Sequence, residues 1–541
     1  MYNSRWLALS HYWVAFAVFM LAVVLGFWQM LMRSPLPAPL DDPNLYYASV
    51  TLHGTAMAYV VTTFFAMGFG YAITATSLGR PIRGVIAAWI CFAICLAGTL
   101  MAVAAILSGR ASVLYTFYPP LLGSAWYYSG ATLLIGGSMI WVVLMIVNMA
   151  AWKRDNPGQP VPLAMFAITA TALLWAWAAS GVELEMIGIL LPRAFGLTVE
   201  MDAGLGRTLF SVTLHAIVYF WLMPAYIAFY TLVPQVAGGR LYSDTMGRLT
   251  FIMFLLFSIP VGIHHLLADP EVGVGFKFLQ SSLTFLVTLP TLLTVFSMCA
   301  SLEIAGRHHG GTGLFGWIAA LPWNEPMILA VGLSLVMLGL GGGGGLINMS
   351  YGMNSLIHNT AWVPAHFHLI FGGAVVIMYF AIAYEMWPRI TGKPLRSKRM
   401  ARWQLWLWFV GMMTMSIPWH ITGLMGQPRR VAIFDFSDPL LAPMAPLAIL
   451  SVVGGLILLL SAILFITILV RSQFGDVVVR EPLRYALAVN PPVRVPSALN
   501  GFALWNVILL MFMIVEYGYP IGQFFVLKSS VPVVEMTRHE P

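Results

Sequence analysis

Thirteen apolar runs, each long enough to cross a lipid bilayer, limit the possible folds of this 541-residue chain. A transmembrane helix needs about 20 mostly apolar residues. Hydrophobic residues make up 60% of the sequence and charged residues 9%, whereas a soluble domain is nearer half apolar and a quarter charged. The pattern predicts an all-α polytopic membrane protein with transmembrane helices near 11–32, 50–77, 84–107, 128–151, 162–191, 207–235, 247–267, 276–304, 325–347, 359–388, 402–424, 441–471 and 500–523.

The basic residues predict how these helices are oriented. With a cytoplasmic N-terminus, the cytoplasmic segments hold 18 of the 27 Lys and Arg residues, among them Arg480, and leave 9 for the outer side. The positive-inside rule favours this orientation, which places the C-terminus outside. The same loops account for the net charge of +7, so we expect a lipid membrane and no nucleic acid as a partner.

No linker, charge block or internal repeat divides the chain, so we treat residues 1–541 as one transmembrane domain. The first apolar run is too long for a signal peptide and is interpreted as a retained span. Cys91, Cys95 and Cys299 form no disulfide framework or metal motif and are interpreted as packing residues. The glycine tract 339–345 indicates tight packing or an irregular helix end.

Histidines inside the spans are the strongest functional signal. Eight of the twelve lie within the predicted spans, and the predicted topology puts six of these at one depth, toward the outer face: His53, His215, His264, His265, His366 and His368. One such residue would be interpreted as a hydrogen-bonded core histidine. Six polar groups in a membrane are costly, and a layer of neutral imidazoles is what a buried metal or haem assembly needs.

The spacing of the histidines distributes them among metals. Residues i and i+2 of a helix point about 200° apart, so His366 and His368 should ligate two different haems on opposite sides of one helix. His53 is available as the second axial ligand of one of these haems. The remaining three, His215, His264 and His265, make a site that suits copper with an open position. Because adjacent helical residues point about 100° apart, we expect the helix carrying His264 and His265 to distort near Pro260 or at its end.

Tyr219 follows His215 by four residues and so shares its helical face. It is either a hydrogen-bond partner only or a donor of a proton and an electron to bound oxygen, and position alone leaves both open. Two files of hydroxyl groups lie on the cytoplasmic side of it. Any one hydroxyl would ordinarily bond back to its own helix, but together the files predict a proton path. One file is Tyr226 and Tyr230, which reaches about 16 Å below Tyr219 at 1.5 Å per residue. The other, on a second helix, is Thr291, Thr294 and Ser297.

These residues stand in motifs that resemble subunit I of the haem–copper oxygen reductases, most closely the B-type cytochrome c oxidases. The resemblance extends over nearly the whole chain. Its motifs, in order, are TLHGTAMA (51–58), VLYTFYPPLLG (113–123), GRTLFSVTLHAIVYFWLMPAY (206–226), PVGIHHLLADP (260–270), HNTAWVPAHFHL (358–369) and QPRR (427–430).

The resemblance implies roles for individual residues. His53 and His368 match the low-spin haem ligands, His366 matches the high-spin haem ligand, and His215, His264 and His265 match the copper ligands. Tyr219 matches a tyrosine that the family joins covalently to the first copper histidine and uses as a proton and electron donor. Arg429, Arg430 and His358 match residues at the haem propionates, a role suited to guanidinium groups. The hydroxyl files match the K-type proton channel of the B-type family, and no acidic constellation resembles the D-type channel.

The sequence departs from the family pattern beside the metal site. Leu214 and Ala216 replace the glycine and proline that flank the first copper histidine, and Ser211 and Val212 replace two tryptophans. These changes are expected to alter the pocket wall and the bend of the helix. Asn354 replaces an aspartate near a haem propionate, so an ionisable group is missing where pumped protons are thought to wait.

The resemblance implies a terminal respiratory oxidase that reduces O2 to water and translocates protons. It implies a low-spin haem of b type, a high-spin haem of a type or a variant of it, and copper. Electrons would come from cytochrome c or a similar donor through a separate subunit II with a binuclear copper centre, because this chain has no cysteine-rich copper site. The expected location is a bacterial or archaeal plasma membrane.

Two alternative functions fit parts of the sequence. Nitric oxide reductase uses the same scaffold with a carboxylate near the non-haem metal, which Glu183 or Glu185 could supply, but it usually lacks the tyrosine at Tyr219. A multispan transporter would account for the spans and the hydroxyl files but not for six histidines at one depth.

Overall fold

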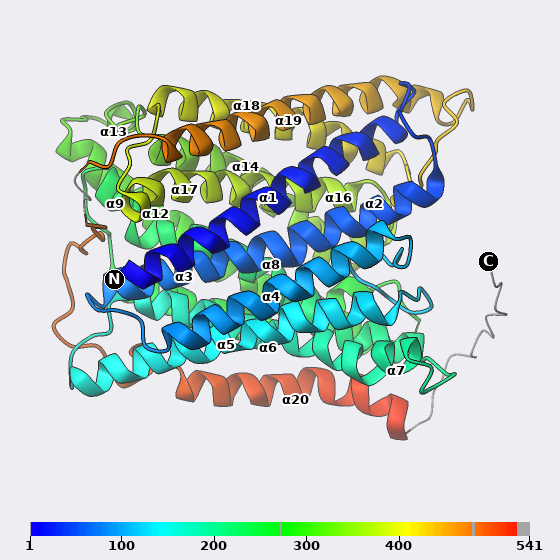
Figure 1. Cartoon of the computed structure of the whole chain (residues 1–541), viewed down its shortest axis with the longest axis horizontal. Coiled ribbons are helices and arrows are strands. Elements are labelled where there is room, and N and C mark those ends of the chain that lie inside the picture. The colour runs from blue at the N-terminus through cyan, green and yellow to red at the C-terminus, as the bar shows by residue number, and fades with distance from the viewer. Residues whose placement is uncertain (1, 271, 479–481, 527–541) are drawn as a thin grey trace.

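The structure, a computed structural model, describes residues 2–270, 272–478 and 482–526 as a bundle of long helices lying side by side (Figure 1). The start of α1 and the end of α20 lie at opposite ends of this bundle (Figure 1), as an odd number of spans requires. Arg480 and residues 527–541, which we expected on the cytoplasmic and outer sides, lie outside the described residues.

The described secondary structure is α-helical with short π- and 3₁₀-helical segments, and the only strand-like pairings in these ranges are two isolated bridges. The elements in chain order are α1 (Tyr2–Met32), α2 (Pro43–Thr55), η1 (Ala56–Val61), α3 (Thr62–Ser77), α4 (Val85–Leu107), α5 (Ala125–Asp155), α6 (Leu163–Glu185), η2 (Met186–Leu190), α7 (Leu191–Ala194), α8 (Ala203–Thr231), α9 (Val233–Val236), α10 (Asp244–Ser258), η3 (Gly262–Leu266), α11 (Val274–Thr284), η4 (Phe285–Val287), α12 (Thr288–His308), α13 (Gly316–Ala319), α14 (Pro326–Met349), α15 (Tyr351–Ile357), α16 (Trp362–Phe367), η5 (His368–Val375), α17 (Val376–Thr391), α18 (Lys398–Leu424), η6 (Ala442–Met444), α19 (Ala445–Gln473), η7 (Ser497–Leu499) and α20 (Ala503–Val526).

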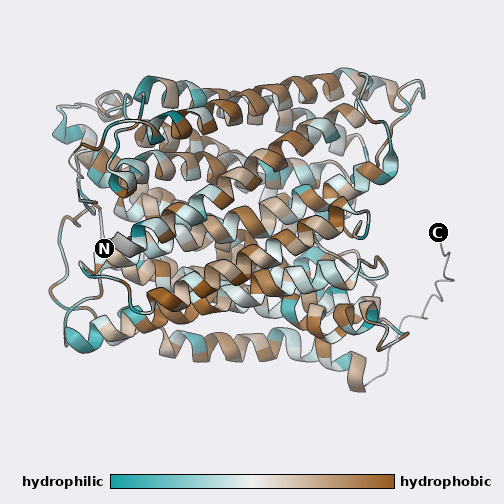
Figure 2. Cartoon of the chain, in the orientation of Figure 1, coloured by the Kyte–Doolittle hydropathy of each residue, from teal (hydrophilic) through white to brown (hydrophobic). Residues whose placement is uncertain are grey.

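Within the described ranges, eleven helical segments are long and apolar enough to cross a membrane. The other two of the thirteen expected spans coincide with α18, which has 27 residues, and α10, which has 15. α10 is short because the chain leaves the α-helix before Pro260 and continues as η3. Apolar residues cover the middle of the bundle, while hydrophilic residues gather toward the helix ends and loops (Figure 2), as a membrane protein requires.

Glycines let pairs of spans approach closely. A Cβ at Gly98 of α4 would lie 2.5 Å from the carbonyl oxygen of Gly130 on α5, and a Cβ at Gly454 of α19 would lie 2.5 Å from the amide nitrogen of Met415 on α18. Small residues at such crossings maximise van der Waals contact where lipid supplies no hydrophobic driving force between helices. These pairs keep α4 with α5 and α18 with α19 as tightly packed units.

π-helical segments interrupt three spans beside residues singled out by the sequence. η1 begins three residues after His53, η2 begins directly after Glu185, and η5 begins at His368. A π-helical turn rotates the residues that follow it relative to a regular helix, and such segments are frequent at functional sites. Irregular backbone therefore shapes the same level of the bundle that carries the histidines.

Candidate metal centre

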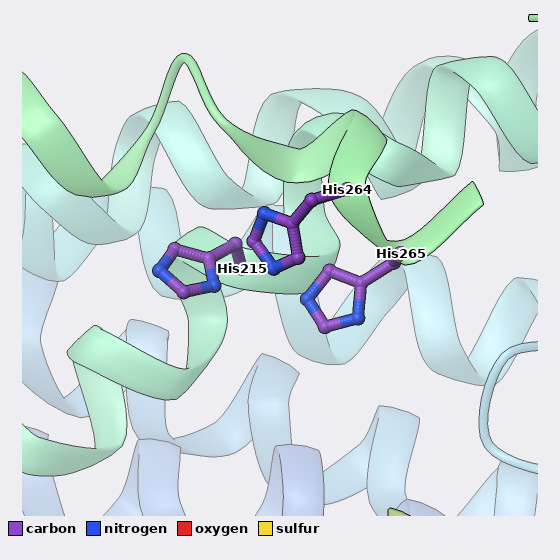
Figure 3. A group of neighbouring side chains, drawn as sticks. All are labelled: His215, His264 and His265. Atoms are coloured by element: carbon purple, nitrogen blue, oxygen red, sulfur yellow. The ribbon is translucent and has the colours of Figure 1, made fainter. Parts of the chain in front are cut away.

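Three imidazoles converge on one point in the bundle. His215 comes from α8, and His264 and His265 come from η3 (Figure 3). One possible ligand atom from each lies within 4.8 Å of the others, and the centroid of the His215 ring is 4.5 Å from that of His264 and 5.8 Å from that of His265. The Nε2 atom of His215 is buried with no hydrogen-bond partner among the described residues. An orphaned buried nitrogen facing two further imidazoles fits a metal ion.

The local sequence explains how two adjacent histidines reach the same metal. α10 ends at Ser258, Pro260 follows, and Gly262–Leu266 forms a 3₁₀ turn. This confirms the expected distortion, because a proline removes a backbone donor and excludes the preceding turn of a helix. The resulting turn lies against α8, where a Cβ at Gly262 would come within 1.7 Å of the Ser211 carbonyl oxygen. Only glycine fits this contact.

Thr284 of α11 fixes the orientation and the tautomer of His264. The Thr284 hydroxyl donates to the carbonyl oxygen of Gln280 at 2.6 Å and lies 3.0 Å from Nδ1 of His264. Since its one proton is used, the hydroxyl accepts a hydrogen bond from Nδ1–H, which leaves Nε2 of His264 free for a metal. Hydrogen bonds of this kind orient metal ligands. Thr284 is not singled out by the sequence, because it lies 20 residues from His264.

His53 and His368 form a second pair. Their ring centroids are 6.2 Å apart, and their planes differ by 20°. Nδ1 of His53 bonds the carbonyl oxygen of Ala22 at 2.7 Å, and Nδ1 of His368 bonds that of Pro364 at 2.7 Å. Both Nδ1 atoms therefore donate, and both Nε2 atoms are left as acceptors. A metal–imidazole bond takes about 2 Å, so this separation fits one iron between the two rings.

His366 faces away from this pair, toward the glycine tract of α14. A Cβ at Gly344 would lie 3.0 Å from Nδ1 of His366, and a Cβ at Gly345 would lie 3.3 Å from Cε1. The tract is a site of tight packing, and the expectation of an irregular helix end is wrong because α14 continues to Met349. Nδ1 of His366 is buried without a described partner. His366 and His368 thus face different surroundings.

The predicted hydroxyl files are only partly connected. The Tyr230 hydroxyl lies within hydrogen-bond reach of the Thr250 hydroxyl at 3.1 Å and of the Thr294 hydroxyl at 3.3 Å. Thr291 and Thr294 each donate to the main-chain carbonyl four residues earlier. Thr250 of α10 is a member of this group that the sequence did not reveal.

Nearer the metal centre, the Tyr219 ring lies 4.9 Å from the His215 ring. Phe254 packs against Tyr219 and against Tyr226, at 5.3 and 5.0 Å between ring centroids. The Tyr226 hydroxyl is buried with no described hydrogen-bond partner, and Ser297 is fully buried on α12.

The predicted propionate-binding residues lie together in two loops. Arg429 donates to the Asn359 side chain through Nη2 at 2.8 Å, and Nδ1 of His358 lies 3.0 Å from Oδ1 of Asn354. Burial, and then the neighbouring Arg430, lowers the pKa of Arg429 to about 10. Burial, followed by the charges of nearby arginines, lowers the pKa of His358 to about 4. A cluster of half-buried guanidinium groups with a neutral imidazole suits an anionic group such as a carboxylate.

The two acidic residues weighed for the alternative function lie elsewhere. Among the described residues, the three-histidine group includes no carboxylate. Glu185 is fully buried with both oxygens unpartnered. A Cβ at Gly206 would lie 3.3 Å from its Oε1, and Gly206 precedes His215 on α8 by nine residues, about 13 Å along a helix. Glu183 lies beside Gly136 of α5.

Comparisons with known proteins agree with this geometry. Residues 7–457 match the family model described as cytochrome c and quinol oxidase polypeptide I. The chain is 38% identical over 496 residues to cytochrome c oxidase subunit 1 of Thermus thermophilus, covering 90% of this chain and 88% of that protein. It is 28% identical over 454 residues to cytochrome c oxidase subunit 1 of Thermostichus vulcanus, covering 80% and 76%. A cryo-EM structure described as a heme-copper terminal oxidase dimer matches with a TM-score of 0.94 and 33% identity, covering 99% of this chain and 96% of that one.

Proposed function

Because the chain belongs to the family of cytochrome c and quinol oxidase polypeptide I, the haem–copper oxidase subunit I, we propose that its three converging histidines hold copper and that three others hold two haems. The protein is the catalytic subunit of a terminal oxidase, which is an oxidoreductase. Its cytochrome c oxidase relatives are bacterial, and it is a multi-pass plasma-membrane protein. Its family carries haems and copper, which, when bound, pass electrons to dioxygen and reduce it to water. Nitric oxide reductase is not favoured, because the relatives are cytochrome c oxidase subunits and no carboxylate joins the described histidine group.

The observation that carries the proposal is the three-histidine group. His215, His264 and His265 provide three nitrogen ligands and leave an open position, a set that suits copper. The Thr284 contact holds the Nε2 atom of His264 toward this point. Ligation requires neutral imidazoles, which offer a nitrogen lone pair to the metal.

The haem ligands are assigned from the faces of one helix. His368 pairs with His53, and their paired Nε2 atoms suit a six-coordinate low-spin haem. His366, which faces α14, is assigned to the high-spin haem. His366 and His368 stand two residues apart on one helix and would each hold one haem, and the two haems would supply electron transfer to the copper site. We propose b type for the former and a type or a variant for the latter.

Tyr219 is assigned the donation of a proton and an electron beside the copper. Its ring lies 4.9 Å from the His215 ring, close enough to serve a molecule bound at the open position. Replacement protons reach it from the cytoplasm through Tyr226 and Tyr230, with Thr291, Thr294 and Ser297 along α12. The Tyr230 contact with Thr294 supports this route, since proton transfer needs hydroxyl groups within hydrogen-bond reach.

The outer loops are assigned to the haem propionates. Arg429, Arg430 and His358 supply donors and positive charge for carboxylates. Oδ1 of Asn354 accepts a hydrogen bond from Nδ1–H of His358, but Asn354 carries no ionisable carboxyl group. The proposed oxidase therefore translocates protons without an acid at this position.

Electrons are proposed to come from cytochrome c or a similar donor. The family works with a subunit II, and we assign the binuclear copper centre to that partner. Residues 1–541 act as one catalytic domain with the N-terminus in the cytoplasm and the C-terminus outside, as the distribution of basic residues indicates.

The experiment is a metal count on a ligand variant. His264→Ala should lose copper while both haems are retained, because it removes one of three copper ligands and no haem ligand. The control, His308→Ala, changes an exposed histidine at the end of α12 and should keep copper and haem. Equal copper in both variants would refute the assigned site.

A further inference from the structure

α20 contacts the metal-binding turn with a small set of buried residues. It is a peripheral helix at the edge of the bundle (Figure 1), and only 22% of its most apolar stretch is buried. Its buried residues are Leu509, Glu516, Tyr517 and Pro520. Two of these four are polar, although a lipid-facing helix gains nothing by burying polar groups. Their contacts therefore need an explanation.

Tyr517 holds the turn through a single backbone bond. The amide N–H of Gly262, the first residue of η3, donates to the Tyr517 hydroxyl at 2.9 Å. A Cβ at Gly262 would lie 2.7 Å from that hydroxyl and 1.7 Å from the Ser211 carbonyl oxygen of α8. Gly262 is thus held between α8, four residues before His215, and α20.

Glu516 acts on the other side of the same turn. Its Oε2 accepts from Nε2 of Gln280 at 2.7 Å, and the same Nε2 donates to the carbonyl oxygen of Pro260 at 3.1 Å. Gln280 is fully buried, and Glu516 is 6% exposed. The main-chain carbonyl oxygen of Gln280 also accepts a hydrogen bond from the Thr284 hydroxyl, which orients His264. α20, α11 and the turn therefore share one hydrogen-bonded network.

An apolar cluster completes the contact. Tyr517 packs with Val212 of α8, with Ile263 and Leu266 of η3, and with Val272. Val212 is one of the positions where the sequence departs from the family pattern beside the metal site. The altered wall of α8 is covered here by the ring of Tyr517.

We propose that α20 clamps the metal-binding turn: Tyr517 and Glu516 are positioning residues that hold His264 and His265 toward His215 and so determine how firmly copper is retained. The inference rests on the proposed copper centre and adds to it two residues that position the ligands. Neither residue is a ligand. Each acts through the backbone of residues 260–262, two to four residues before His264.

The test measures copper loss from the purified complex during incubation with a copper chelator, with haem absorbance as the internal reference. Tyr517→Phe removes the hydroxyl and keeps the ring, and should release copper about 10-fold faster than wild type, the lower end of the effect seen when groups that orient ligands are removed. The matched control is Tyr519→Phe on the same helix, where the ring is 55% exposed and stacks on Phe276. It should release copper at the wild-type rate.

A second pair of variants gives the same comparison if Tyr517→Phe does not assemble. Glu516→Ala should release copper faster than wild type, whereas Glu516→Gln keeps an acceptor for Gln280 and should restore slow release. Carbon monoxide is added as a probe of the copper, and its infrared band should broaden only in Tyr517→Phe and Glu516→Ala. General loosening of α20 would broaden the band in the control variant Tyr519→Phe as well.

Wild-type release rates in Tyr517→Phe and Glu516→Ala would overturn the clamp. A wild-type complex with no copper beyond the binuclear centre of subunit II would instead overturn the copper centre of this chain, so the two failures are distinguishable.

Discussion

Replacing Tyr230 with phenylalanine tests the proposed proton path where the structure connects it best. The hydroxyl of Tyr230 contacts Thr250 at 3.1 Å and Thr294 at 3.3 Å, and Tyr230→Phe removes both contacts while keeping the ring. Proton transfer through a positioned side chain typically contributes about 100-fold or more to a rate. We expect turnover limited by proton delivery to fall by about this factor.

The assay is oxygen consumption at saturating reduced donor, together with the rate of haem reduction under anaerobic conditions. Tyr230→Phe should slow oxygen consumption and leave haem reduction unchanged. Tyr242→Phe is the matched control, because Tyr242 is 42% exposed and packs on Phe296 outside the file. Thr294→Val removes one of the two contacts and keeps the Tyr230 hydroxyl, so it should cause a smaller loss. Oxygen consumption by Tyr230→Phe as fast as that of Tyr242→Phe would refute the path.

Three further predictions concern the metal centre and the outer loops. Tyr219→Phe should abolish oxygen consumption with the copper and haem content unchanged, and appreciable residual turnover would contradict its assigned role. Thr284→Val should weaken copper retention about 10-fold or more, since it removes the acceptor for Nδ1–H of His264; unchanged copper loss to a chelator would contradict this. The pKa of His358 lies below its ordinary value of 6.5, at about 4, so between these pH values the unfolded chain binds a proton that the folded chain does not. Stability should therefore fall as pH drops from 7 to 5, and the Tm of His358→Asn should fall less steeply than that of wild type.

The sequence was sufficient to predict the class of fold and most of the spans, because hydrophobic length is a local property that a bilayer enforces. It also predicted the break before His264, since Pro260 limits α10 regardless of the surroundings. The grouping of His215 with His264 and His265 followed from depth and helical angle, whereas the pairing of His53 with His368 was implied by the resemblance to the family. The structure brings both sets together.

What the sequence could not reveal depends on contacts between distant segments. Thr284 reaches His264 across 20 residues, and Tyr517 reaches Gly262 across 255; no local pattern marks either residue. The π-helical segment that begins at His368 is likewise not marked by a local sequence pattern. The contacts of Gly344 and Gly345 with His366 explain a tract that composition alone left ambiguous.

The most direct test of the proposed oxidase is a reduced-minus-oxidised absorption spectrum of the purified wild-type complex, combined with counts of copper and iron in this chain. We expect two haems, one low-spin and one high-spin, and one copper per chain, with electrons delivered to oxygen. One non-haem iron in place of copper, with activity only toward nitric oxide, would contradict the proposal.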